Sequence, residues 1–204
     1  MKVFHVGLLS GVIGVFCAMP SFGSSLCDAV PGNLVANCGF ETGDLTDWPV
    51  TAASSGSLVG VDGADINSGS FDAFFGAVDG INDYIDQSIV TNAGDLYNIS
   101  FYVDASNEGV ATPDEFVANW DGTNLLTIPG ATGSGYESYS FAETASTTST
   151  DLQFGGASVD GFYYLDDVSV TDVTPSPEPA SIAFAAAGLF GTWLMKRRYS
   201  TKQV

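Results

Sequence analysis

The side chains that could do chemistry in the central part of this chain are almost all carboxylates. All 24 acidic residues lie between Asp28 and Glu178, whereas the five Lys and Arg residues and the single histidine, His5, lie outside that interval. Two carboxyl groups about 5–10 Å apart can hydrolyse a glycosidic bond. In such a pair Glu108, Glu115, Glu137 or Glu143 would have to meet an aspartate in a cleft. Their spacing favours no particular pair.

The lack of Lys, Arg and His between Asp28 and Glu178 excludes most catalytic designs. It leaves no Ser-His-Asp or Cys-His site, no Schiff-base lysine and no arginine to hold a phosphate. With 24 acids and no bases, the interval has a formal charge of about −24, so each carboxylate must be solvated, hydrogen-bonded or bound to a cation. This charge also disfavours nucleic acid as a partner. We therefore expect a protein that is not an enzyme.

A sugar-binding site needs less, namely a flat aromatic ring and a few polar side chains. Trp120 stands between Asn119 and Asp121, and Tyr84 stands close to Gln87. We take Trp120, Tyr84 and Gln87 as candidate ligand-binding residues. The alternative for Trp120 is a place in the hydrophobic core, where tryptophan is found more often.

Short β-rich runs separated by Gly, Asn and Asp predict that all these residues lie on strands or in turns. In residues 97–104 the apolar side chains alternate with polar ones, so they share one face of a strand. No comparable helical pattern precedes residue 180. The predicted strands are 33–37, 57–61, 73–78, 84–90, 97–104, 116–120, 125–128, 136–141, 152–154 and 163–171. This pattern favours an all-β, antiparallel two-sheet sandwich.

Two segments resemble the opening and closing strands of jelly-roll, galactose-binding-like domains. They are NLVANCGFETGDLTDW at residues 33–48 and FYYLDDVSV at residues 162–170. The likeness covers residues 30–173, the middle through spacing alone, and we place the domain at residues 26–173. Many non-catalytic carbohydrate-binding modules share this fold, so the resemblance implies that the chain binds polysaccharide.

The same resemblance implies a structural calcium ion where the first and last strands meet. In that family the ligands are an acidic side chain after Gly-Phe, here Glu41, and one in the closing Asp-Asp-Val, here Asp167 with Asp166 beside it. Calcium takes six to eight oxygen ligands, which an acidic domain can supply. The alternative is that Asp166 and Asp167 cap a sheet edge while Glu41 accepts backbone hydrogen bonds in a turn.

Residues 1–25 have the pattern of a secretory signal peptide. Lys2 precedes an apolar segment at residues 6–19, and small residues follow. We expect signal peptidase to cleave after Gly23 or Ser25.

Cleavage would leave two cysteines in the exported protein, Cys27 and Cys38, since Cys17 lies in the signal peptide. In an oxidising compartment such a pair most simply forms one disulfide. The alternative is two free thiols.

Residues 174–204 combine a linker that ends in Pro177, Glu178 and Pro179, an uncharged run at residues 180–195, and the basic residues Lys196, Arg197 and Arg198. As a helix the run spans about 24 Å, slightly less than the roughly 30 Å hydrocarbon core of a bilayer. The basic residues would stop transfer and stay on the cytoplasmic side. An ordinary single-span anchor and an amphipathic core helix are the alternatives.

This order of parts resembles the PEP-CTERM sorting signal of Gram-negative bacteria. The resemblance implies that an exosortase in the inner membrane recognises residues 177–179, and that the single-pass precursor is processed to a cell-surface or extracellular-matrix protein. We therefore expect an exported jelly-roll protein that binds polysaccharide. The alternatives are an acidic matrix protein bridged by calcium, without specific glycan binding, and a carboxylate-based glycoside hydrolase.

Overall fold

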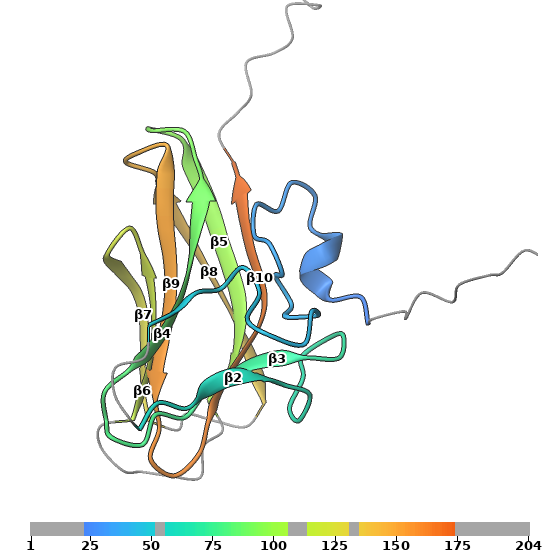
Figure 1. Ribbon diagram of the computed structural model, residues 1–204. Helices are drawn as coiled ribbons and strands as arrows, with labels where there is room; N and C mark the ends of the chain where they lie inside the picture. The colour runs from blue at the N-terminus through green and yellow to red at the C-terminus, as the bar shows by residue number, and fades with distance from the viewer. Residues whose placement is uncertain (1–22, 52–55, 106–113, 131–134, 174–204) are drawn as a thin grey trace, which may run out of the picture.

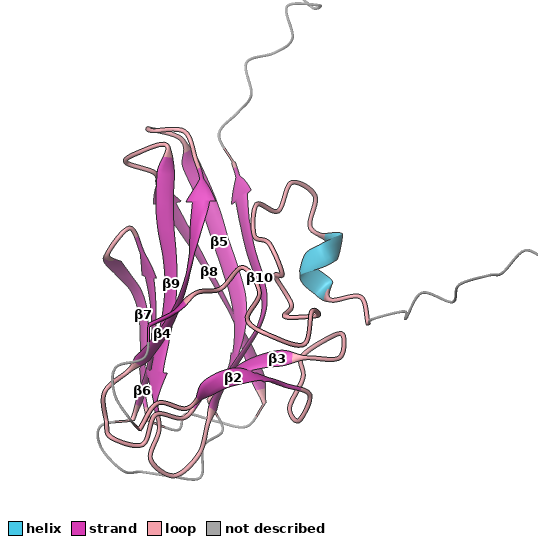
Figure 2. Ribbon diagram, viewed as in Figure 1, coloured by secondary structure: helices cyan, strands magenta, loops and turns pink. Residues whose placement is uncertain are grey.

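The computed structural model describes residues 23–51, 56–105, 114–130 and 135–173, and within these ranges the chain forms a jelly-roll sandwich of two antiparallel sheets (Figures 1 and 2). Sheet A has the strand order β1-β4-β9-β6-β7, and sheet B has the order β2-β3-β10-β5-β8. The strands are β1 (Val50–Thr51), β2 (Val59–Asp62), β3 (Asp72–Phe75), β4 (Asp83–Val90), β5 (Leu96–Asp104), β6 (Glu115–Trp120), β7 (Thr123–Pro129), β8 (Tyr136–Thr144), β9 (Ser149–Ala157) and β10 (Tyr163–Asp172). The predicted fold class is confirmed.

Alternation of apolar and polar residues explains how the long strands bury one face. Burial alternates residue by residue along β4, and along β5 the apolar residues from Tyr97 to Val103 are the buried ones. Each predicted strand from residue 57 onward overlaps an observed strand, with ends that differ by a few residues. The periodicity therefore identifies which side of each strand faces the core.

The predicted strand at residues 33–37 is wrong, because residues 33–35 are irregular, residues 36–37 belong to a turn, and Asn37 has a positive φ of 45°. The side chain of Asn33 takes the place of a strand here. Its Oδ1 accepts from the amide of Val170 at 3.0 Å, and its Nδ2 donates to the carbonyl oxygen of Val168 at 3.2 Å. A side-chain amide thus meets backbone groups of β10 that a neighbouring strand would otherwise pair with. The two-residue strand β1 was not predicted.

Aromatic rings from both sheets form the centre of the core. Phe101 of β5 meets Phe154 of β9 edge to face, with 5.0 Å between ring centroids, and Phe75 of β3 meets Phe116 of β6 at 5.7 Å. Trp48, which precedes β1, is 1% exposed and lies 5.9 Å from Phe154. These contacts join the inner faces of the two sheets, and the functional residues must lie on the outer faces or in the loops.

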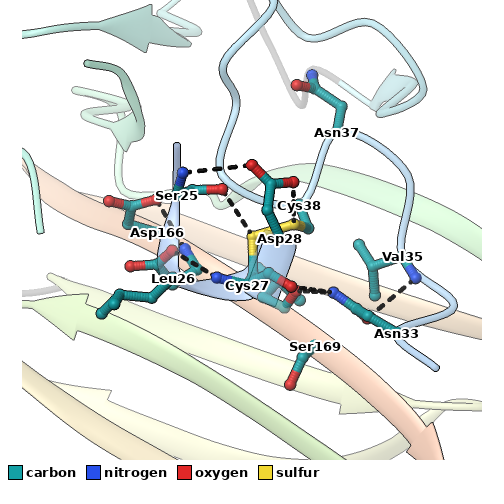
Figure 3. The surroundings of a disulfide bond; sticks show 12 residues. Ser25, Leu26, Cys27, Asp28, Asn33, Val35, Asn37, Cys38, Asp166 and Ser169 are labelled. Carbon is teal, nitrogen blue, oxygen red and sulfur yellow. Dashed lines mark hydrogen bonds between the residues drawn. A yellow bond between two sulfur atoms is a disulfide. The ribbon is translucent and has the colours of Figure 1, made fainter. Parts of the chain in front are cut away.

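The predicted disulfide joins Cys27 and Cys38 (Figure 3). Cys27 belongs to a short 3₁₀ helix, Leu26–Ala29, that lies beside β10 (Figure 1). The amide of Cys27 donates to Asp167 Oδ1 at 3.1 Å, and the amide of Val168 donates to the carbonyl oxygen of Cys38 at 2.9 Å. The bridge therefore closes an N-terminal loop whose two ends are both attached to the last strand.

The predicted sorting motif, the apolar run and the basic tail, together with most of the predicted signal peptide, lie outside the described residues. Within the described ranges, no helix is long and apolar enough to cross a membrane.

Replacing Cys27 and Cys38 together with serine is expected to lower the free energy of unfolding by about 3 kcal/mol, because the bridge restricts the unfolded chain over a short loop. The measurement is urea denaturation of the oxidised wild type, the double variant and the reduced wild type. The last two should unfold at similar urea concentrations, both below that of the oxidised protein. A common midpoint for all three would contradict the expectation.

Candidate functional site

The outer face of sheet A is one of two places where functional side chains gather. On β4 the odd-numbered residues from Asp83 to Ile89 are buried, so Tyr84, Asp86 and Ser88 lie on the opposite, outer side. Strands β9, β6 and β7 continue this face beyond β4, in that order. The outward positions on these strands determine what the face can bind.

Tyr84 lies across the neighbouring strand. It pairs in register with Gly155 of β9, and a Cβ atom on this glycine would overlap the tyrosine ring. The missing side chain at Gly155 therefore makes room for the ring, which is half-buried. An aromatic ring seated in this way can present its other face to the C–H groups of a sugar.

A ladder of side-chain amides runs beside the ring. The register places Asp86, Gln153, Asn119 and Asn124 in one row across β4, β9, β6 and β7. Asn119 Nδ2 donates to Gln153 Oε1 at 3.2 Å, and Asn124 Nδ2 donates to Asn119 Oδ1 at 3.3 Å. Each amide has both donors and acceptors, which is what binding of sugar hydroxyls requires.

Carboxylates border this ladder. Asp151 is opposite Ser88 in the next row, and its pKa is raised first by burial and then by the charges of Asp86 and Asp121. A shallow groove of about 420 Å³ continues the face past β4 toward the N-terminal segment. Its lining residues are Leu34, Ala36, Asp47, Pro49, Asp86, Gln87, Ser88 and Val90. The face is therefore polar and acidic around one aromatic ring, and the groove that continues it is partly apolar.

Of the three ligand-binding residues predicted from the sequence, the structure places only Tyr84 on this face. Trp120 is 2% exposed and its ring lies 6.0 Å from that of Tyr97, so the core alternative for Trp120 is correct and its ring face cannot contact a sugar. Gln87 lies on the other side of β4 from Tyr84. Its Nε2 donates to the carbonyl oxygens of Ala36 at 3.0 Å and Asp47 at 3.2 Å, and its Oε1 accepts from the Ala36 amide at 2.8 Å. Gln87 thus holds the N-terminal segment against β4.

The glutamates considered for hydrolysis are spread over the molecule. Glu115 lies on β6 of sheet A and accepts a hydrogen bond from Asn82 Nδ2 at 2.8 Å. Glu137 and Glu143 lie on β8 of sheet B, six positions apart and therefore about 20 Å from each other. Glu108 lies outside the described residues. Glu137 and Glu143 are therefore too far apart to form a catalytic pair with each other.

The second candidate site is the loop between β2 and β3, which three carboxylates hold. Asp166 Oδ2 accepts from the amides of Asn67 at 3.1 Å and Ser68 at 3.0 Å. Asp167 Oδ2 accepts from Asn67 Nδ2 at 2.7 Å and from Ser68 Oγ at 2.8 Å. Two of the three acidic residues predicted as calcium ligands therefore bind this loop, and the third is Glu41.

Glu41 binds the other end of the same loop. Its Oε1 accepts from the amides of Ser70 at 2.8 Å and Phe71 at 3.2 Å. Gly69, with φ of 72°, is required here because a Cβ atom at this position would overlap the Glu41 carboxylate. These bonds agree with the alternative that Glu41 accepts backbone hydrogen bonds in a turn, but they involve only one of its two carboxylate oxygens.

The other oxygen, Glu41 Oε2, is buried and has no hydrogen-bond partner. Burial also raises the pKa of Asp166 to about 7, against the lowering effect of the Ser68 amide. A buried carboxylate oxygen without a hydrogen-bond partner fits the ligand chemistry of calcium. Within the described ranges, the one group of three acidic or cysteine side chains with ligand atoms mutually within 4.8 Å is Cys27, Asp28 and Cys38. Its sulfurs form the disulfide, so this group is not a metal site.

Known proteins with the same fold include carbohydrate-binding modules. TmCBM61, solved in complex with β-1,4-galactotriose, superposes with a TM-score of 0.55 at 16% identity, over 69% of this chain and 98% of that chain. A putative sugar-binding protein from Bacteroides thetaiotaomicron gives 0.52 at 10% identity, over 69% and 99% of the two chains. The enzymatically active domain of bacteriophage CBA120 tailspike protein 4 gives 0.54 at 16% identity, over 69% of this chain but 21% of that chain.

At these identities the likeness shows the fold alone. No protein-family model matches the chain, and no curated protein matches it. The jelly-roll fold of the described residues is thus one that sugar-binding modules and an enzyme domain both use, and the site residues must decide between these functions.

Proposed function

We propose that this protein is a non-catalytic carbohydrate-binding module that holds a polysaccharide on the outer face of sheet A. The observation that carries the proposal is the ring of Tyr84, which lies over Gly155 next to the amide ladder of Gln153, Asn119 and Asn124. An aromatic ring beside several amide donors and acceptors is suited to a neutral sugar chain. The sugar-binding proteins that share the fold support the same function.

The charge of this face defines the ligand further. Asp86 and Asp151 border the ladder, and no Lys, Arg or His occurs between Asp28 and Glu178 to counter them. A polysaccharide that carries uronate or sulfate groups would be repelled, whereas the hydroxyls of a neutral glycan can donate to the carboxylates. The preferred ligand is therefore a neutral glycan.

A calcium ion at the β2–β3 loop is the second part of the proposal. Glu41 and Asp166 would hold it together with backbone carbonyl oxygens, and Asp167 would keep the loop in place through Asn67 and Ser68. The support comes from the buried, unpartnered Oε2 of Glu41. The role of the ion is structural, because it ties the N-terminal segment, the loop and the last strand together.

Export and sorting are the third part. The composition of residues 1–25 and 174–204 supports a signal peptide and an exosortase-recognised sorting signal at residues 177–179, with the inner membrane and then the cell surface or matrix as the route. Ser25 adds a constraint on signal peptidase. It is 3% exposed, and a Cβ atom at Gly39 would overlap it, so cleavage after Gly23, which keeps Ser25, is the site we propose.

Tyr84→Ala is expected to weaken binding of a neutral polysaccharide by tenfold or more, about 1.4 kcal/mol, because it removes the ring on which the sugar lies. Affinity electrophoresis against a panel of neutral and uronate-containing polysaccharides measures this. Tyr84→Phe, which keeps the ring, should retain most of the affinity, and Tyr102→Ala on the outer face of sheet B should have no effect. Calcium-dependent self-association without binding to any glycan would instead favour the acidic matrix protein.

Removing calcium with EDTA is expected to lower the melting temperature of the wild type by roughly 2–6 °C, the loss of about 1–1.5 kcal/mol from a site near tenfold saturation. Glu41→Gln lacks this site, so EDTA should lower its melting temperature by less than that of the wild type. Glu143→Gln, a matched change on β8, should respond like the wild type. A calcium response in Glu41→Gln as large as that of the wild type would contradict a role for Glu41.

Replacing Pro177, Glu178 and Pro179 with alanine is expected to leave the precursor in the inner membrane with its basic tail attached. In a bacterium that processes the wild type, fractionation and mass measurement of the protein would detect the longer membrane-bound form. Ser176→Ala in the adjacent linker serves as the control and should be processed normally. Equal processing of the triple variant would argue against recognition of this motif.

A further inference from the structure

The outer face of sheet B contains a group of carboxylates that neither the glycan site nor the Glu41 site uses. Asp62 of β2 and Asp72 of β3 are directly opposite each other in the antiparallel pair. Like charges in this position destabilise a sheet. Either a cation must therefore lie between these two carboxylates, or one of them must carry a proton.

One carboxylate oxygen of Asp72 lacks a hydrogen-bond donor. The residue is 0% exposed. Its Oδ2 accepts a hydrogen bond from Tyr136 Oη at 2.8 Å, whereas its buried Oδ1 has no partner as long as both carboxyls are ionised; a hydrogen bond with the Asp62 side chain forms only if one of the two carries a proton. A carboxylate oxygen buried without any partner is costly, and no basic residue occurs between Asp28 and Glu178 to compensate it.

Another carboxylate lies on the same face of sheet B, two strands away from Asp72. Asp104 of β5 is 1% exposed. Across the sheet it pairs with Tyr136 of β8 on one side and with Tyr164 of β10 on the other. This row of paired residues is adjacent to the row that contains Asp72. Besides burial, the charges of Asp62, Asp65, Asp72 and Asp104 all raise the pKa of Tyr164. The four carboxyl groups are therefore within electrostatic reach of one ring on β10.

We propose that Asp62 and Asp72 form a second cation site that takes calcium. Calcium fits better than an organic ammonium ion, because Asp72 is buried and a small bare ion can reach a group that a ligand with a carbon skeleton cannot. Its ligands are hard oxygens and its coordination is flexible, so backbone carbonyls and water can complete a set that starts from two carboxylates. Tyr136 holds Asp72 in position through Oδ2 and leaves Oδ1 for the ion.

This site is separate from the one at Glu41. The free oxygen of Glu41 belongs to a carboxylate that binds the amides of Ser70 and Phe71, whereas Asp72 faces Asp62 across β2 and β3. Asp166 lies close enough to Asp72 for its charge to raise the pKa of Asp72, although burial is the main cause. The two proposed ions would therefore lie near each other at one end of sheet B. Asp72 would bind only one of them.

Calcium stoichiometry, measured by equilibrium dialysis of the full chain at physiological ionic strength, tests this proposal. Asp72→Asn is expected to bind one calcium ion fewer than the wild type. The variant should fold, because the asparagine carbonyl can still accept the Tyr136 hydrogen bond, and in EDTA it should melt above the wild type because the two opposed charges are gone. Asp160→Asn, an exposed acid on the β9–β10 loop, is the control for the loss of one charge and should keep the wild-type stoichiometry.

Glu41→Gln and the Glu41→Gln, Asp72→Asn double variant separate the two sites. Independent sites predict that the double variant loses one ion more than Asp72→Asn alone. If Glu41→Gln keeps the wild-type stoichiometry while Asp72→Asn loses an ion, the Glu41 site fails and the second site stands. If both single variants and the double variant lose the same single ion, one shared site exists and the proposal is overturned. Wild-type stoichiometry in Asp72→Asn would overturn it as well, and would leave a shared proton between Asp62 and Asp72.

Discussion

The structure of this domain depends on how it accommodates many carboxylates without a single basic side chain. Between Asp28 and Glu178 no Lys, Arg or His is available, so buried acids must use neutral donors, protons or external cations. Asp166 and Asp167 use the first solution, with backbone amides and the side chains of Asn67 and Ser68 as donors. Where neutral donors are lacking, at Glu41 Oε2, Asp72 Oδ1 and Asp114 Oδ2, a carboxylate oxygen is buried without a hydrogen-bond partner. The first two are the atoms at which we propose that cations bind.

The same carboxylates also connect segments that are distant in the sequence. Asp167 accepts from the amide of Cys27 and binds Ser68, and Glu41 binds Ser70, so the N-terminal segment, the β2–β3 loop and β10 share one set of hydrogen bonds. The disulfide closes the N-terminal segment on itself. One end of sheet B is therefore held by polar and covalent links, while the two sheets are held together by aromatic packing. The glycan site that we propose lies away from this cluster, around Tyr84 on the outer face of sheet A.

Local alternation in the sequence predicts most of the strands, because it reports on the two faces of each strand separately. It also contains information that the site prediction did not use. Tyr84 and Gln87 are three positions apart, and Asn119 and Trp120 are neighbours, so on strands each pair must point to opposite faces. The row of Asp86, Gln153, Asn119 and Asn124 could not be predicted, since it depends on the register between β6 and β9. Asn33 was misassigned to a strand because its side chain, rather than its backbone, binds β10.

Calcium binding would make the stability of the domain depend on its location. Calcium sites in extracellular modules commonly have dissociation constants of about 10⁻⁴ to 10⁻³ M. At tenfold excess of the free ion, one site adds about 1.4 kcal/mol to the free energy of unfolding, and two independent sites add roughly twice that, close to the contribution of the disulfide. The bridge closes the N-terminal segment beside β10, and the two proposed ions would bind at the β2–β3 loop and at the pair of strands that it joins. The bridge and the ions would add little to the free energy of unfolding in a reducing, calcium-poor compartment. They would add the most outside the cell, so the domain would become most stable only after export.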